Sequence, residues 1–203
     1  MLELLMALPP EHRTRRMQDL QAILDATPAE KLFDFPVLQP LDHQLIGSFI
    51  QLFNYVDLNL RRSIETFARA NLLQGEAAKK YPRIHSSAVA SAVQDAVKAM
   101  DSSSEDISEA LRILEIVERR RELRNLLGHW AARRIVGQDA IVLISKDEKD
   151  AMRVGGTYLG SGRCKTAILD LADVRGLIAN ELIPFEKWLA FKTSEWRRRY
   201  AGD

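Results

Sequence analysis

The spacing of apolar residues predicts long helices on either side of a short run of β-branched residues. Between residues 41 and 73, apolar side chains recur every three or four positions, which is the period of one helix face. The same period continues through the small-residue stretch 86–100 and through a helix that begins near Ser103 or Ser104 as its cap and is expected to run to about Val136.

The pattern changes after Gly137. The run AIVLIS at residues 140–145 and the segment Arg163–Asp170 are typical of strands, and glycines at 155–162 mark a turn-rich connection with a further strand. A last helix is predicted from Asp173, as its N-cap, to about Tyr200, with a bend at Pro184.

This order of elements favours a mainly α fold. We expect an up-and-down helical bundle over residues 41–203, with a small antiparallel β insertion at about 140–171, before the last helix. Residues 1–40 are predicted to form a separate N-terminal helical extension. It has a helix over 11–24 and a second, brief helix that Thr27 caps, with Pro28 at its first position.

The composition narrows the class of protein without naming a function. A net charge of +1 gives no global attraction to nucleic acid or membrane, so any affinity for RNA must come from local patches. The single Cys164 excludes an internal disulfide, and no apolar run reaches the roughly 18 residues of a membrane span. A cytoplasmic location without membrane contact is expected, and the scattered histidines predict no metal site.

Candidate chemistry gathers late in the helix that is expected over residues 103–136. Arg121, Asn125 and His129 are four apart and therefore lie along one side of it. Arg124 lies off that line, but its long side chain can bend back toward a phosphate-sized space beside His129. Gly128 costs a helix interior about 1 kcal/mol relative to alanine. The close approach of another helix or of a ligand would offset that cost.

The segment Arg124-Asn125-Leu126-Leu127-Gly128-His129 resembles the arginine–histidine signature of HEPN domains, in the form where a polar residue follows the arginine. The resemblance implies an all-α bundle and, in many members, a metal-independent endoribonuclease that needs no cofactor. It also implies a homodimer, in which two such helices meet across a two-fold axis, near Gly128, and form one cleft for RNA.

The residue types suit that chemistry. RNA is cut when its own 2′-hydroxyl attacks the adjacent phosphorus, which leaves a 2′,3′-cyclic phosphate. Histidine, with an ordinary pKa of about 6.5, can act as base or acid, which assigns this role to His129. A guanidinium can hold the phosphate, which assigns that role to Arg124 with support from Asn125.

Further residues are predicted to surround the cleft. The RNA-binding candidates are Arg120, Arg121, Arg133 and Arg61, with Asp57 and Asn59 as possible supporting groups. The alternative for the arginines on the motif helix is a solvated helix face with intrahelical ion pairs. For Asn125 the alternative is an exposed residue without a role.

The resemblance suggests an effector of the toxin or abortive-infection type, with an antitoxin or regulatory protein as a possible partner. Ala131 stands where one toxin branch of the family carries a tyrosine that accepts nucleotides, so that form of regulation is not expected. The alternative function is a non-catalytic bundle that binds a partner protein, a nucleotide or RNA. A third interpretation is a helical scaffold whose residues 1–40 bind another component.

Overall fold

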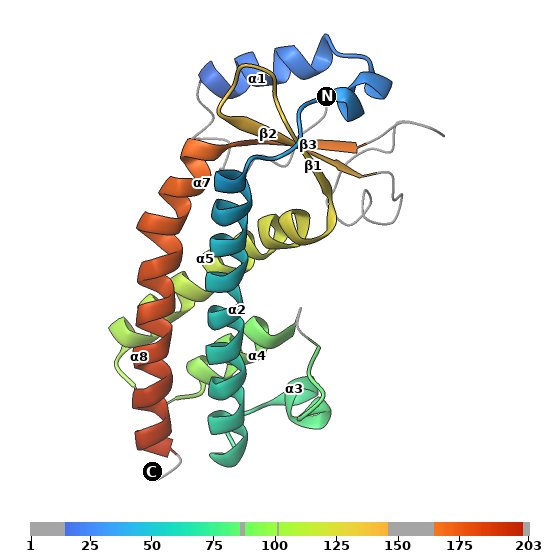
Figure 1. Cartoon of the computed structure of the whole chain (residues 1–203). Helices are drawn as coiled ribbons and strands as arrows, with labels where there is room; N and C mark the ends of the chain where they lie inside the picture. The colour runs from blue at the N-terminus through green and yellow to red at the C-terminus, as the bar shows by residue number, and fades with distance from the viewer. Residues whose placement is uncertain (1–14, 86–87, 101, 146–164, 201–203) are drawn as a thin grey trace. The chain divides into compact units, whose positions relative to one another are not determined.

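A computed structural model describes residues 15–85, 88–100, 102–145 and 165–200, and it confirms the mainly α fold with a small antiparallel sheet before the last helix (Figure 1). Its elements in chain order are α1 (Arg15–Asp25), η2 (Ala29–Asp34), α2 (Pro40–Arg69), α3 (Gly75–Lys80), α4 (Val89–Lys98), α5 (Ser104–His129), β1 (Ala131–Arg134), β2 (Ala140–Ser145), β3 (Lys165–Asp170), α7 (Leu171–Leu177), the π-helical turn η4 (Ile178–Leu182) and α8 (Ile183–Tyr200). The predicted helix start at residue 11 and the predicted strand and turns at 155–162 lie outside the described residues.

The chain forms two compact units, and α2 and α5 contribute to both. The first unit comprises Met1–Ile50 and Glu122–Ala179, and the second comprises Gln51–Arg121 and Asn180–Asp203. The predicted boundary of a separate extension at residue 40 stays a prediction. Within the described residues, no helix is both long and apolar enough to cross a bilayer.

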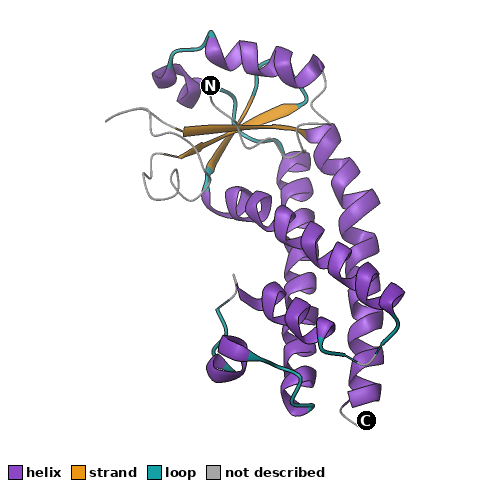
Figure 2. Cartoon of the chain, turned by 180° about the vertical axis from the view of Figure 1, so that it is seen from behind, coloured by secondary structure: helices purple, strands orange, loops and turns teal. Residues whose placement is uncertain are grey.

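The first unit is built on the sheet, in the strand order β1-β2-β3, with both pairs antiparallel (Figure 2). The central strand β2 is buried on both faces from Ala140 to Ile144, so its sequence is continuously apolar rather than alternating. Strands over 140–145 and up to Asp170 confirm the sequence prediction.

One face of this sheet is covered by the N-terminal helices. Leu20 and Leu24 of α1 and Leu32 of η2 form a buried cluster with Val142, Ile144 and Ile168 of the sheet. Arg16 of α1 also pairs with Asp170 at the end of β3. The predicted cap of η2 is wrong, because the Thr27 hydroxyl donates backwards to the Ile23 carbonyl and Pro28 occupies the cap position.

A buried ion pair fastens the start of α2 to the edge strand β1. Both carboxylate oxygens of Asp42 accept from Nη1 of Arg134, at 2.8 and 3.0 Å. Asp42 also accepts from the backbone N–H of Gln39 at 2.7 Å, which satisfies one unpaired donor at the helix start. The backbone N–H of Arg134 donates to the Pro36 carbonyl at 2.8 Å. Strand β1 is thus joined to α2 through side chains and to the segment just before α2 through the backbone.

The motif helix ends earlier than predicted. Helix α5 stops at His129, and residues 131–134 form β1 instead of continuing the helix to Val136. Alanine and arginine favour helices, so local propensity is overridden here by pairing with β2, in a register that opposes Ala131 to Ile144. Gly137, with φ of +69°, makes the turn that the hairpin needs.

The second unit packs α2, α4, α5 and α8 through apolar side chains. Phe53, Val56, Leu60 and Phe67 of α2 are fully buried, and the Phe67 ring lies 5.1 Å from the Trp196 ring of α8. A buried hydrogen bond of 2.9 Å joins Ser63 to Thr193 in the same contact.

Two helix boundaries differ from the sequence expectation. Helix α2 ends at Arg69 rather than near residue 73, because Asn71 adopts φ of +57° and the N–H groups of Asn71 and Leu72 return to the Ala68 and Phe67 carbonyls. The last helix is capped by Asp170, whose carboxylate accepts from the Ala172 N–H at 2.8 Å, and not by Asp173.

A π-helical turn, η4, ends two residues before Pro184, and the predicted bend at Pro184 stays a prediction. Proline has no N–H to donate to the carbonyl four residues before it, and a widened turn is one way to accommodate that loss. Ser103 caps α5 as predicted, since its hydroxyl accepts from the Asp106 N–H at 3.2 Å.

Candidate active site at the end of helix α5

His129 is the last residue of α5, and its imidazole is exposed. The apolar side chains around it form a buried stripe, in which Leu123, Leu127 and Trp130 are each less than a tenth exposed. These buried side chains pack the end of α5 against the rest of the first unit. The polar residues of the motif therefore lie on the side of the helix that faces solvent.

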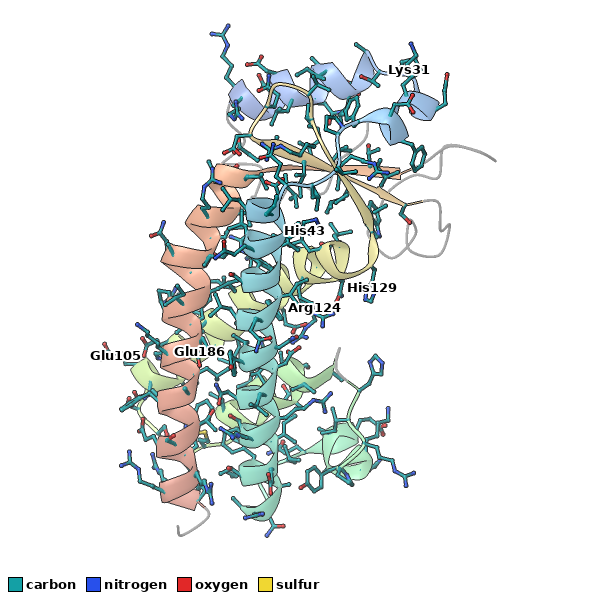
Figure 3. All side chains as sticks on the ribbon, viewed as in Figure 1. Lys31, His43, Glu105, Arg124, His129 and Glu186 are labelled. Atoms are coloured by element: carbon teal, nitrogen blue, oxygen red, sulfur yellow. The ribbon has the colours of Figure 1, made fainter. Side chains whose placement is uncertain are left out.

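Arg124 bends toward the line of Asn125 and His129, as its position on the helix requires. Its Nη1 lies 3.5 Å from Oδ1 of Asn125, a long hydrogen bond, and 3.8 Å from the point where a Cβ on Gly128 would stand. Figure 3 labels Arg124 and His129 near the end of α5. The half-buried guanidinium thus lies along the helix surface, between the positions of Asn125 and Gly128.

Gly128 has no described neighbour other than Arg124 within 4 Å of its missing Cβ. Within the described chain, no second helix approaches it. The space beside Gly128 is therefore occupied by the guanidinium of the motif, and no other atom that the described residues place there lies within 4 Å of that point.

Replacing Gly128 by alanine is expected to raise the free energy of unfolding by about 0.5–1 kcal/mol, because glycine is the less favourable helix residue and 3.8 Å is an ordinary contact distance. Urea denaturation of the wild type and Gly128→Ala measures this. A loss of stability would show that the position is more crowded than these distances indicate.

Arg120 and Arg121, which the sequence nominates for RNA, are both 9% exposed and are held by carboxylates. Arg120 donates twice to Glu181, at 2.8 and 3.0 Å. Arg121 donates twice to Asp57, at 2.8 and 3.1 Å, and once to Glu118, at 2.7 Å. These contacts give both guanidinium groups a structural role in the second unit.

Burial alone would lower the pKa of Arg121, but the hydrogen bonds that Arg121 donates to Asp57 and then to Glu118 outweigh it, so the pKa is raised above its ordinary value. The group therefore remains a cation. It also lies over the Phe53 ring, 5.3 Å from its centre.

The other residues that the sequence analysis proposed for RNA binding or support differ in how exposed their side chains are. Asp57 is half-buried in its pair with Arg121, and Asn59 is buried, its backbone carbonyl accepting from Ser63 at 2.9 Å. Arg61 is exposed and Arg133 is half-buried. In the described part of the chain, neither of these two arginines makes an ion pair.

The structure thus brings Arg124 and Asn125 into contact and places His129 one turn after Asn125, all in the first unit. Asp57, Asn59, Arg61, Arg120 and Arg121 belong to the second unit. Sequence reasoning did not find the partner of Arg120, because Glu181 lies 61 residues away and nothing local signals the pairing. The described residues contain no cluster of three or more histidine, cysteine or acidic side chains that could hold a metal ion.

Comparison with known proteins adds no relative. No family model matches the chain, and no curated protein or solved structure matches it significantly.

Proposed function

We propose that the chain is a metal-independent endoribonuclease of the HEPN type. The observation that carries the proposal is the arrangement of Arg124. Its guanidinium turns back to Asn125 and Gly128, on the same side of α5 as the exposed His129. Hydrogen-bond donors that could hold a phosphate, and a group able to transfer a proton, therefore lie at the same solvent-facing end of the helix.

The reaction that fits these groups is an internal transesterification. The 2′-oxygen of RNA forms a bond to phosphorus while the bond from phosphorus to the 5′-oxygen breaks. The proton of the 2′-hydroxyl passes to a base, and the departing 5′-oxygen receives a proton. His129 suits either proton transfer, and the Arg124 guanidinium suits the charge that grows on the phosphoryl oxygens.

One chain supplies one His129 at this place, and the reaction moves two protons. We propose a homodimer in which the motif ends of two copies form one cleft, so that one histidine takes a proton and the other gives one. The exposed surface around Gly128 leaves room for a second copy. A cytoplasmic growth-arresting or antiphage effector, restrained by an antitoxin or regulatory protein, is the biological setting that we propose.

A non-catalytic bundle remains the second candidate, and the pairing of Arg120 and Arg121 with carboxylates favours it. These pairs remove two cations from the predicted RNA surface. A protein that only binds a partner has no need of His129.

The proposal is tested by incubating the purified chain with a mixture of transfer, messenger and ribosomal RNA in excess EDTA. We expect cleavage that EDTA does not inhibit and new ends that carry a 2′,3′-cyclic phosphate and a 5′-hydroxyl. The mass of the protein in solution, by light scattering, should be that of a dimer. Ends with a 3′-hydroxyl, or cleavage that EDTA abolishes, would reject the mechanism. No cleavage of any of these RNAs would favour the binding function.

A further inference from the structure

The solvent face of α2 in the second unit carries an aromatic and an aliphatic side chain that its amphipathic pattern does not require. Tyr55 is 47% exposed and Leu58 is 44% exposed, whereas Phe53, Val56 and Leu60 of the same stretch of α2 are fully buried. The two residues are three apart and therefore adjacent on the helix surface. Arg62 continues the same line one turn later, and Arg61 lies beside it.

This face also has an uncompensated positive charge. The acidic residues nearest in sequence are already paired elsewhere: Asp57 with Arg121 at 2.8 Å, and Glu65 with Arg69 at 2.6 Å. Among the described residues, no carboxylate lies within 4.0 Å of a nitrogen of Arg61 or Arg62. Two exposed guanidinium groups therefore lie on the same face of α2 as an exposed aromatic ring, about two turns further along the helix, and the described residues place no ion-pair partner beside them.

We propose that the face formed by Tyr55, Leu58, Arg61 and Arg62, the α2 face, binds a single-stranded segment of RNA. This inference rests on the proposed function for the choice of RNA as the polyanion. The Tyr55 ring stacks on one base, and Leu58 covers the apolar edge of that contact. Arg61 and Arg62 hold phosphates further along the strand.

The spacing suits one strand that lies along the helix. Arg61 and Arg62 follow Tyr55 by six and seven residues, which is roughly 9–10.5 Å along a helix axis. Stacking requires an unpaired base, so the α2 face should prefer single-stranded over double-stranded RNA. The proposed contacts include no hydrogen bond to the edge of a base, so we expect little preference for RNA sequence.

Binding is measured by fluorescence anisotropy with a labelled single-stranded 2′-O-methyl RNA. Its blocked 2′-oxygen prevents the proposed cleavage, so binding is read independently of catalysis. We expect Tyr55→Ala to raise Kd about tenfold and Tyr55→Phe to leave it nearly unchanged, because phenylalanine keeps the stacking surface. The matched control is Phe191→Ala, which removes another exposed aromatic side chain of the same unit.

The contribution of Arg61 and Arg62 to RNA binding is measured separately, from its dependence on salt concentration. In the double variant Arg61→Gln/Arg62→Gln, the slope of log K against log salt concentration should fall in magnitude by about 1.4, which corresponds to two phosphate contacts on a single strand. Arg112→Gln, an exposed arginine of α5, should weaken binding much less than either replacement on the α2 face.

Several results would overturn the proposal. Equal affinity of the wild type and Tyr55→Ala would remove the α2 face as an RNA site while leaving cleavage at His129 untouched. Equal binding of double-stranded RNA would exclude stacking. Binding of polyglutamate as tightly as RNA, with the same dependence on Arg61 and Arg62, would indicate an acidic protein partner instead.

Discussion

RNA cleavage by His129→Ala is expected to be about 10²–10⁴-fold slower than by the wild type, because this change removes the side chain to which the proposed reaction assigns proton transfer. His129 is exposed, and its removal breaks no contact of the buried apolar stripe. The free energy of unfolding should therefore change by no more than about 0.5 kcal/mol. Initial rates on one labelled RNA, measured with both proteins at equal concentration, give the ratio.

His43→Ala is the matched control, since His43 is an exposed histidine of α2 outside the motif, also labelled in Figure 3. It should cut RNA at the wild-type rate. Arg124→Ala should lose activity as His129→Ala does, and Arg124→Lys should recover only part of it, because a lysine cannot make the bidentate contact. Equal rates for the wild type and His129→Ala would place the activity elsewhere.

Asp42→Ala is expected to lower the free energy of unfolding by about 3 kcal/mol, the usual effect of removing one partner of a buried ion pair. The Asp42 side chain is only 4% exposed and that of Arg134 is 17% exposed, so water cannot replace the lost carboxylate easily. The change also leaves the Gln39 N–H at the start of α2 without its acceptor. Urea denaturation, followed by circular dichroism, measures the difference.

Asp19→Ala provides the control, because Asp19 is an exposed aspartate of α1 in the same unit, and we expect an effect within about 0.5 kcal/mol. Removing both partners, in Asp42→Ala/Arg134→Met, should cost less than the sum of the two single changes, since the double variant does not leave the buried Asp42 carboxylate without its arginine. A cost below about 1 kcal/mol for Asp42→Ala would show that the pair is hydrated in solution.

At the candidate site, the local sequence pattern was enough to predict which side chains of α5 are buried and which are exposed. The period of apolar residues in α5 was sufficient to place Leu123, Leu127 and Trp130 in the interior and His129 outside, because one helix face follows directly from 3.6 residues per turn. The sequence predicted that Arg124 can bend back toward the space beside His129, and the structure shows its guanidinium 3.5 Å from the side-chain oxygen of Asn125.

The local sequence pattern gave wrong predictions where contacts with distant segments determine the secondary structure or the ion pairs. Residues 131–134 favour a helix by propensity, and only pairing with β2 makes them a strand that ends α5 at His129. The basic cluster of α5 was interpreted as a possible RNA surface. Glu181, Asp57 and Glu118 instead hold Arg120 and Arg121, and two of these three carboxylates lie more than 60 residues from their arginines.

The sequence by itself determined the helical class, the strand at β2, a serine cap at residue 103 or 104 and the exposed face of the motif, because each depends on neighbours within a few residues. The tertiary structure alone decided which charges are available to a ligand and where α5 ends. Ion pairs and strand ladders join residues far apart in the chain, and no periodicity encodes those partners.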